Sequence, residues 1–248
     1  MDKNDKYCAA LVRESDRDRY LATLFAPAER RSALFSLYAF DIEISRIRDL
    51  AREPMPGEIR LQWWREVLEG ERAGEAAANP VSAALLATLA QHRLAADKLT
   101  GLLEVRRFDV YDEPMPTLAA LQSYASDTAG AIFDCATRIL GATSEENAIE
   151  AGRAQTIANV IALLPPHAAR RRLFVPLDLL RQYGSSPDEV FALQASPELR
   201  AVLAELRLRA RRHLTRIAEL STNIPEKIWP AFLSLAPLRP WRVLHPKE

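Results

Sequence analysis

Along the helical segment 34–49, polar side chains recur on one side of the helix. An α-helix turns by about 100° per residue, so residues spaced three, four and seven apart share a face. A stripe of this kind is usually a solvated face whose charges pair locally. Its two carboxylates could instead help to hold a hard metal ion. The stripe consists of Tyr38, Asp41, Ser45, Arg48 and Asp49, with Glu43 on the other side.

A second helical segment, 152–164, carries two amides in an otherwise apolar context. Gln155 and Asn159 are four residues apart and share a face, so they form either a structural amide pair or the wall of a cavity. Downstream, His167 and the run 170–172, which is Arg-Arg-Arg, make a local positive patch. Such a run is either a solvated loop or a phosphate-binding element.

These residues must be positioned by helices, because helical periodicity runs nearly from end to end and no alternation requires a strand. Eight glycines in 248 residues also disfavour a sheet with tight hairpins. Leu173-Phe174-Val175 is expected as an extended loop. Ser15 is expected to cap a short first helix, and Pro165-Pro166 to end a later one. The expected helices are 28–51, 58–71, 80–93, 95–109, 117–140, 145–164, 177–183, 187–193 and 197–220, followed by a segment over 224–235 that packs back.

Composition places the chain among ordinary globular proteins. It has 248 residues, 48% hydrophobic and 27% charged. Together with the helical periodicity, this predicts one all-α domain over 1–248. Lys+Arg and Asp+Glu are 33 each, so no excess of positive charge favours a nucleic-acid partner. The two cysteines indicate no disulfide framework, and the acidic first twenty residues do not resemble a targeting peptide. No long uncharged apolar stretch occurs. We therefore expect a cytoplasmic protein.

Three stretches carry a resemblance to a known family. Residues 19–40, which read RYLATLFAPAERRSALFSLYAF, are similar to the opening of the squalene/phytoene synthases. The stretch 169–176, ARRRLFVP, resembles the arginine-rich loop after that family's second motif. Tyr124, followed by Ala129-Gly130, lies where the family has a tyrosine and a small-residue step. The resemblance covers about 15–235 and leaves a proline-rich tail, 236–248.

That family implies an isoprenoid-synthase-type helical bundle around a central apolar cavity, with two acidic motifs at its mouth that bind Mg²⁺ and a diphosphate. Here most of the acids are missing. The first motif falls on Ser45 and Asp49, with Arg46 in place of a further acid. The second retains Asn159, but its acids fall on Leu163 and His167. The positions that match the family are Tyr38, Asp49, Asn159 and Arg172.

The stretches 155–178 and 56–65 are similar to a divergent branch of the family, the bacterial relatives of mitochondrial complex I assembly factor six. This resemblance implies a non-catalytic protein that binds an isoprenoid or other lipid, or a protein of a respiratory complex. No cofactor is then expected. The alternative is an active head-to-head prenyl transferase, in which Asp41 and Asp49 would be the residual catalytic candidates and Mg²⁺ would be required. Asp49 and Asn159 are the only retained ligand-type positions.

Aromatic residues near the end of the chain raise a third possibility, peripheral contact with a membrane. Trp229, Phe232, Leu235 and Trp241 could dock on a bilayer interface, or they could close the helical bundle. Trp63-Trp64 leaves a similar alternative open. Two adjacent helix positions cannot both face the same core, so one of these indoles could be partly exposed and mark a contact surface.

Overall fold

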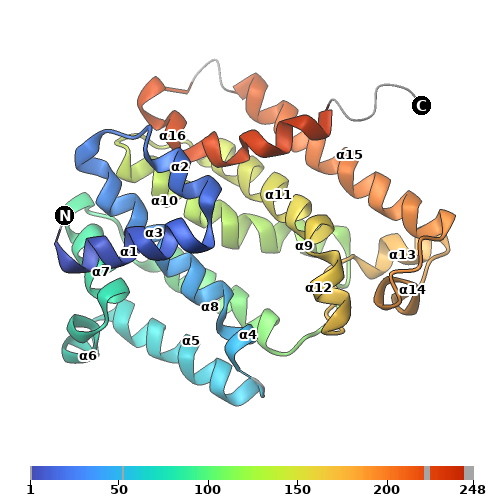
Figure 1. Ribbon diagram of the computed structural model, residues 1–248, viewed down its shortest axis with the longest axis horizontal. Helices are drawn as coiled ribbons and strands as arrows, with labels where there is room; N and C mark the ends of the chain where they lie inside the picture. Colours follow the sequence, from blue (N-terminus) through green and yellow to red (C-terminus); the bar gives the residue numbers. More distant parts are fainter. Residues whose placement is uncertain (1, 52, 221–223, 243–248) are drawn as a thin grey trace.

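A computed structural model describes residues 2–51, 53–220 and 224–242, with the side chains of 239–242 left out. Within these ranges the chain is built from helices and contains no strand, as the sequence predicts (Figure 1). No helix among them is both long and apolar enough to cross a membrane.

In the first half of the chain, the described residues form eight α-helices. A capping box at Asp2 starts the first of them, and Asp16 caps the second. The expectation that Ser15 caps the first helix is wrong, because Ser15 is the last residue of α1. These helices are α1 (Lys3–Ser15), α2 (Arg17–Thr23), α3 (Ala28–Ser45), α4 (Ile47–Leu50), α5 (Pro54–Glu69), α6 (Ala73–Ala78), α7 (Pro80–His92) and α8 (Asp97–Val110).

The second half continues with α-helices and short turns of π- or 3-10 helix. The tail expected from residue 236 begins inside the last 3-10 segment, and its residues 243–248 lie outside the described ranges. The elements are α9 (Leu118–Ala125), the π-helical turn η1 (Ser126–Gly130), α10 (Ala131–Ile139), α11 (Glu145–Ala162), α12 (Leu164–Ala169), α13 (Leu177–Tyr183), α14 (Pro187–Phe191), α15 (Pro197–Leu220), η3 (Glu226–Ile228), α16 (Trp229–Phe232) and η4 (Leu233–Arg242).

The helix expected over 28–51 is interrupted at Arg46. The Ser45 hydroxyl donates to the carbonyl of Ile42 at 3.0 Å, a local bond of the kind that bends helices. The interruption is small, since the amide of Leu50 still donates to the carbonyl of Arg46 at 3.1 Å. As a result α4 follows α3 closely and carries Arg48 and Asp49 to the same side of the molecule as Asp41.

Two further expected helices are also divided. The segment 117–140 contains the π-helical turn η1 between α9 and α10. The segment 145–164 ends at Ala162, and Pro165-Pro166 then lie in the first turn of α12 instead of ending a helix. Proline is tolerated there because the first amides of a helix have no partner within it. The expected loop at 173–175 is confirmed, and the amide of Met115 donates to the carbonyl of Leu173 at 2.8 Å.

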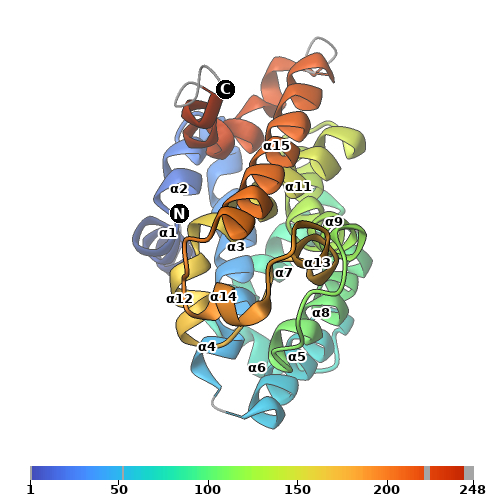
Figure 2. The same ribbon diagram turned by 90° about the vertical axis from the view of Figure 1, so that its right-hand side faces the viewer.

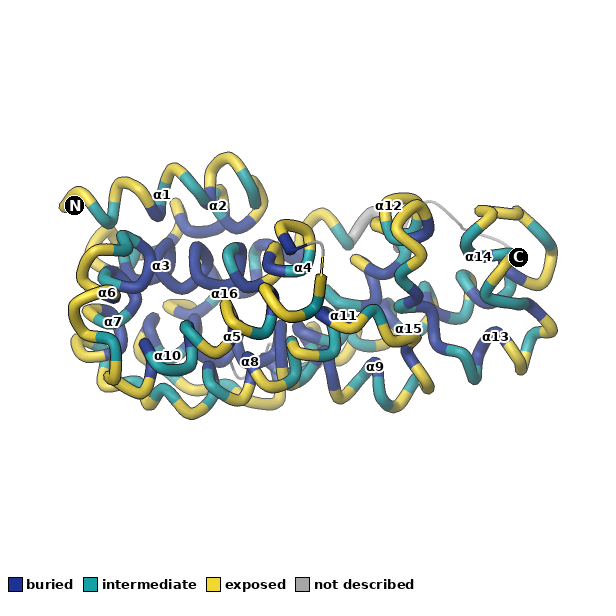
Figure 3. The backbone as a smooth tube through the Cα atoms, turned by 90° about the horizontal axis from the view of Figure 1, so that it is seen from below, coloured by how far each residue is buried: buried dark blue, intermediate teal, exposed yellow. Residues whose placement is uncertain are grey.

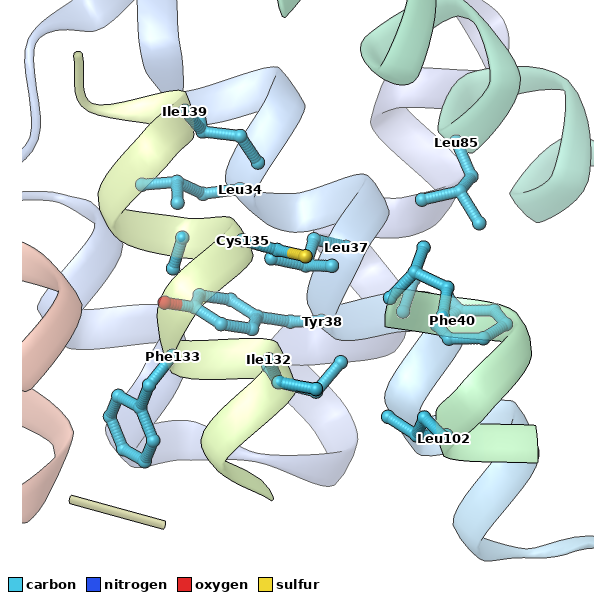
Figure 4. Packing of buried hydrophobic residues seen from close by; sticks show 14 of the residues in the cluster. Leu34, Leu37, Tyr38, Phe40, Leu85, Leu102, Ile132, Phe133, Cys135 and Ile139 are labelled. Atoms are coloured by element: carbon cyan, nitrogen blue, oxygen red, sulfur yellow. The ribbon is translucent and has the colours of Figure 1, made fainter. Parts of the chain in front are cut away.

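The core lies along α3, which is buried over most of its length (Figure 3). Leu34, Leu37 and Phe40 of this helix pack against α7, α8 and α10 (Figure 4). A second apolar cluster joins α9, α11, α13 and α15, and α15 runs along α11 (Figure 2). The polar cavity described below lies where these helices meet the end of α3.

Candidate functional site

A cavity of about 560 Å³ opens between α3 and α4 on one side and α11 and α12 on the other. Nine of the ten side chains predicted as site residues line it, although four different stretches of the chain supply them. Its apolar lining is limited to a few residues, among them Ile42, Ala129, Val160, Leu163 and Phe174, so the interior is more polar than the resemblance implied. The nine are Asp41, Ser45, Arg48, Asp49, Tyr124, Gln155, Asn159, His167 and Arg172.

Tyr38 is the predicted site residue that the structure places outside the cavity. Only 3% of it is exposed, and its ring packs in the core against α10 (Figure 4). The guanidinium of Arg19 lies 5.0 Å from the centre of that ring. Burial raises the pKa of Tyr38 to about 12, so its phenol stays protonated. Tyr38 therefore supports the cavity wall from behind.

A buried ion-pair network forms the inner wall of the cavity. Asp41 accepts a hydrogen bond from Arg19 at 2.6 Å, and Arg106 lies 3.5 Å from its other oxygen. Burial alone would raise the pKa of Asp41, but these two guanidinium groups hold the pKa below its ordinary value of 3.8. Asp41 is thus a carboxylate whose charge is already balanced within the protein.

Tyr124 and Asp109 extend this network. Arg106 donates to the Tyr124 hydroxyl at 2.7 Å and to Asp109 at 3.0 Å. The Tyr124 hydroxyl in turn donates to Asp109 at 2.9 Å. Burial raises the pKa of Tyr124 well above its ordinary value, which keeps this proton on the phenol.

A second set of ion pairs lies at the mouth of the cavity. Asp49 accepts hydrogen bonds from Arg170 at 2.5 Å and from Arg172 at 2.8 Å. The bonds and charges of these arginines outweigh partial burial and lower the pKa of Asp49. Asp112 is also paired with two arginines, Arg172 at 3.1 Å and Arg48 at 3.1 Å. Arg172 therefore joins three distant segments of the chain.

The amides and the histidine complete the lining. Gln155 donates to Asn159 at 3.2 Å, and Asn159 is exposed to the cavity instead of being buried. The ring of His167 packs 4.9 Å from that of Phe174, and its Nδ1 has no hydrogen-bond partner. Burial and the charge of Arg172 lower the pKa of His167, so its imidazole is neutral at pH 7.

Sequence reasoning missed the partners that neutralise the acids. In the sequence, Arg19 stands out only as part of the motif at 19–40, and no local pattern links Asp109 or Asp112 to the site. One pattern does reveal Arg106, because it follows the buried Leu102 and precedes the buried Val110 by one helical turn each. An arginine on the apolar face of a helix requires a buried partner.

The donor set does not fit the magnesium ions that the family implies. Mg²⁺ needs several oxygen ligands, usually carboxylates combined with substrate phosphates. Among the described residues, no group of three or more His, Cys, Asp and Glu side chains is placed to hold a metal ion. Four of the five acids that line the cavity, Asp16, Asp41, Asp49 and Asp109, are paired with arginine, and the fifth, Asp18, is exposed.

Comparison with known sequences decides the family. The sequence pattern of the squalene/phytoene synthases matches residues 12–240, which is nearly the whole chain. The chain belongs to the squalene/phytoene synthase family. The resemblance noted in the sequence is thereby confirmed.

Some relatives of the chain are named as assembly factors of a respiratory complex, and others as synthases. The chain is 29% identical over 237 residues to NADH dehydrogenase (ubiquinone) complex I, assembly factor 6 of Bos taurus, covering 94% of this chain and 71% of that protein. It is 27% identical over 219 residues to the presqualene diphosphate synthase of Sinorhizobium fredii, covering 84% and 76%.

Solved structures of the family share the fold. The squalene synthase HpnC from Alicyclobacillus acidocaldarius has a TM-score of 0.82 at 24% identity, covering 97% of this chain and 92% of that one. A dehydrosqualene synthase in complex with ligand has a TM-score of 0.81 at 19% identity, covering 98% and 87%. The expected isoprenoid-synthase-type fold is confirmed.

Proposed function

We propose that this chain is a non-catalytic member of the squalene/phytoene synthase family that acts by binding, as an assembly partner of a respiratory complex. The observation that carries the proposal is the state of the cavity acids. Each of Asp41, Asp49 and Asp109 is bonded to arginine. A carboxylate held in this way has to share or give up its bonds to arginine when it binds a metal ion, and that costs free energy.

The chemistry of the family explains why this matters. Departure of diphosphate leaves a carbocation, and the charge that develops on the leaving group has to be stabilised more strongly than the ground state. Arginines that are already neutralised by aspartates offer little of this stabilisation. We therefore propose that the chain uses no magnesium cofactor and releases no diphosphate.

The ligand class of the cavity is proposed to be an isoprenoid or another lipid, because the chain has the fold of proteins that handle such molecules. The protein partner is proposed from similarity to complex I assembly factor 6 over 94% of the chain. Nucleic acid is not proposed as a partner, since the net charge is zero. The proposed compartment is the cytoplasm.

The catalytic half of the proposal is tested with farnesyl diphosphate. Purified protein is incubated with this substrate, with and without Mg²⁺, and the release of diphosphate and of a C30 product is measured. An active synthase of the family, assayed in parallel, is the control. We expect neither product above background, and a magnesium-dependent C30 product would overturn the proposal.

The assembly half is tested in the organism that carries the gene. Deleting the gene should lower NADH:quinone oxidoreductase activity and the amount of the assembled complex on native gels. Wild-type protein and the Asp49→Asn variant should both restore them, because no metal-dependent step is required. Normal activity and assembly in the deletion strain would exclude this role.

An active head-to-head prenyl transferase is the second candidate, favoured by the similarity to presqualene diphosphate synthase over 84% of the chain. In that case Asp41 and Asp49 would be the remaining ligands for magnesium. Turnover of farnesyl diphosphate by the wild type that is abolished in the Asp41→Asn, Asp49→Asn double variant would establish this function.

A further inference from the structure

A second hollow, of about 660 Å³, lies between α8, α9 and the loop that joins them, on one side of the molecule (Figure 2). Its lining is mostly apolar and includes Val105, Phe108, Met115 and Leu177. Tyr124 is the only residue that this lining shares with that of the polar cavity. The ring of Tyr124 packs 6.1 Å from Phe108 and 6.2 Å from Phe174 of the cavity lining, so an aromatic wall separates the two spaces.

A smaller hollow, of about 380 Å³, continues the first one along α8 and η1. The two hollows share Val105 and Asp127 in their linings. Gly101, Val105 and Phe108 are spaced four and three residues apart, so they lie on one face of α8 and span about 10 Å of it. Together the hollows form one open groove, the α8–α9 groove, with Gly101, Val105 and Phe108 on one side and Ser123 and Asp127 on the other.

The end of the groove beside the loop is already held in place. The amide of Met115 donates to the carbonyl of Leu173 at 2.8 Å, and the amide of Leu177 donates to the carbonyl of Met115 at 3.0 Å. Pro114 and Pro116 restrict the backbone on either side of Met115. A ligand of this groove therefore does not have to order its wall before it binds.

The rim of the groove carries two acids without partners. Glu113 of the loop and Asp127 of η1 both line the larger hollow, and both are exposed. Neither carboxylate forms an ion pair or a hydrogen bond with another described residue. The lining of the larger hollow includes no basic side chain.

The charges of the smaller hollow largely cancel. Lys98 is paired with Asp134 at 2.9 Å and lies 3.4 Å from Glu145, and Asp134 is also paired with Arg138 at 2.8 Å. Arg181 of α13 is exposed but belongs to neither lining. The unpaired charge within the groove is therefore negative.

Gly101 has no role in the packing of the described chain. A Cβ atom there would meet nothing within 4 Å, although glycine in the interior of a helix is destabilising relative to alanine. Gly74 also has open space, but it lies in the first turn of the short helix α6. A glycine in mid-helix is expected where another backbone approaches closely. Gly101 therefore indicates a close approach by a polypeptide that is not part of the described chain.

We infer that the α8–α9 groove docks a basic amphipathic segment of a partner protein. Apolar side chains of this segment would fill the hollow beside Phe108 and Met115. Its lysines or arginines would pair with Glu113 and Asp127, and its backbone would cross Gly101. The unpaired carboxylates disfavour an anionic bilayer on this surface. The inference rests on the proposed function, because it names the surface through which a chain that acts by binding meets its protein partner.

The C-terminal aromatic segment offers no comparable surface. Phe232 and Leu235 are buried, and Phe232 stacks on Phe133 with ring centres 5.8 Å apart. Trp229 is only partly exposed, and the side chain of Trp241 lies outside the described residues. The described part of this segment therefore closes the helical bundle.

Binding of a model peptide to the full chain tests the inference. The probe is a fluorescent amphipathic peptide of leucine and lysine, and its counterpart carries glutamate in place of lysine. We expect the chain to bind the lysine peptide with an affinity that falls as salt rises, and to bind the glutamate peptide about tenfold more weakly or less. The measurement involves neither the gene deletion nor farnesyl diphosphate, so its failure is distinguishable from failure of the proposed function.

Two variants remove the two features of the groove separately. Gly101→Leu should bind the lysine peptide about tenfold more weakly, yet unfold at the same or a higher urea concentration, because leucine favours a helix more than glycine does. The double variant Glu113→Gln, Asp127→Asn should bind more weakly and with less dependence on salt. The matched control is Glu14→Gln, Glu29→Gln, which removes two exposed carboxylates from α1 and α3 and should bind as the wild type does.

A label in the groove shows where the peptide binds. Cys8 and Cys135 are buried, so an environment-sensitive fluorophore on Ser123→Cys labels the groove selectively. Its emission should shift to the blue with the lysine peptide, whereas the same label on Tyr7→Cys of α1 should not respond.

The inference is overturned if the wild type binds neither peptide or both alike, if Gly101→Leu binds as the wild type does, or if the label on residue 123 shows no shift. Sedimentation of the unlabelled protein gives a further decisive outcome. A wild-type dimer that Gly101→Leu dissociates would assign the groove to a second copy of this chain, and would overturn the inference as well.

Discussion

Asp41 lies between two buried guanidinium groups, those of Arg19 and Arg106. Its oxygens meet Arg19 at 2.6 Å and Arg106 at 3.5 Å, and its side chain is only 10% exposed. Arg19 also lies over the buried ring of Tyr38, while Arg106 reaches Tyr124 and Asp109. The carboxylate of Asp41 therefore links α2, α3 and α8, the three helices that meet in this part of the cavity wall.

Replacing Asp41 by Asn should destabilise the fold strongly. Asparagine has nearly the same shape but no charge, so Arg19 loses its nearest counter-ion and Arg106 loses one of its two. We expect the free energy of unfolding, measured by urea titration, to fall by about 3–5 kcal/mol. Asp49→Asn is the control, because its carboxylate is 38% exposed and should contribute no more than about 1 kcal/mol. Equal losses in the two variants would contradict this account.

The same carboxylate should make stability depend on acid pH. The pKa of Asp41 lies below its ordinary value of 3.8 in the folded chain, so the unfolded chain binds the proton first as pH falls. The stabilisation is complete above that ordinary value and is lost as pH falls through the folded pKa. Urea titrations at descending pH should show a loss below about pH 4 that is smaller in Asp41→Asn. Parallel pH curves for the two proteins would count against it.

At the scale of the elements, the π-helical turn η1 depends on a close approach between helices. A Cβ atom at Gly152 of α11 would lie 2.3 Å from the amide nitrogen of Gly130 and 2.7 Å from the carbonyl oxygen of Ala125. Only glycine allows α11 to pack this closely against η1. This contact sets the position of Tyr124 and Ala129 in the cavity wall relative to Asn159.

Gly152→Ala should force the two helices apart. The clash involves backbone atoms that cannot rotate away, so we expect a loss of about 1–3 kcal/mol in the free energy of unfolding. Gly101→Ala provides the opposite control, because its Cβ in the exposed part of α8 would meet nothing within 4 Å. That variant should gain about 0.5–1 kcal/mol from helix propensity. A neutral Gly152→Ala would mean that the helices can separate without cost.

The sequence predicts the positions of most helices, but not the breaks within them. The helical class, most helix positions and the loop at 173–175 follow from periodicity and from prolines, which act locally. The breaks at Arg46, at 126–130 and at Leu163 do not, because they depend on side-chain hydrogen bonds and on contacts such as Gly152 with Gly130. In the same way, helical spacing brings Asp41, Ser45 and Asp49 together, but it cannot show that arginines from α2, α8 and the 170–172 loop neutralise the acids.

At the scale of the whole molecule, the C-terminal segment completes the larger of the two apolar clusters. Ile228, Phe232 and Leu235 are buried in it, and the stacked rings of Phe232 and Phe133 join α16 to α10. These residues lie about a hundred positions from their partners in the sequence. The middle of the chain and its end therefore depend on one another for stability.

Phe232→Ala should show this dependence. Removing a buried phenyl ring leaves a cavity, and we expect the free energy of unfolding to fall by about 3–5 kcal/mol. Phe25→Ala is the matched control, since its ring is largely exposed and the change should stay within about 0.5 kcal/mol. Thermal unfolding followed by circular dichroism measures both. A Phe232 variant as stable as the control would show that the end of the chain is dispensable.

The ion pairs of Asp49 have a consequence for any anionic molecule that approaches the cavity. Asp49 belongs to the same chain as Arg170 and Arg172, so it is a tethered competitor whose effective concentration is far higher than that of a dissolved anion. A ligand anion must therefore exchange places with it. Salt weakens the internal pair and the ligand pair together. The affinity of this cavity for anions should accordingly vary less with ionic strength than that of a pocket with unpaired arginines.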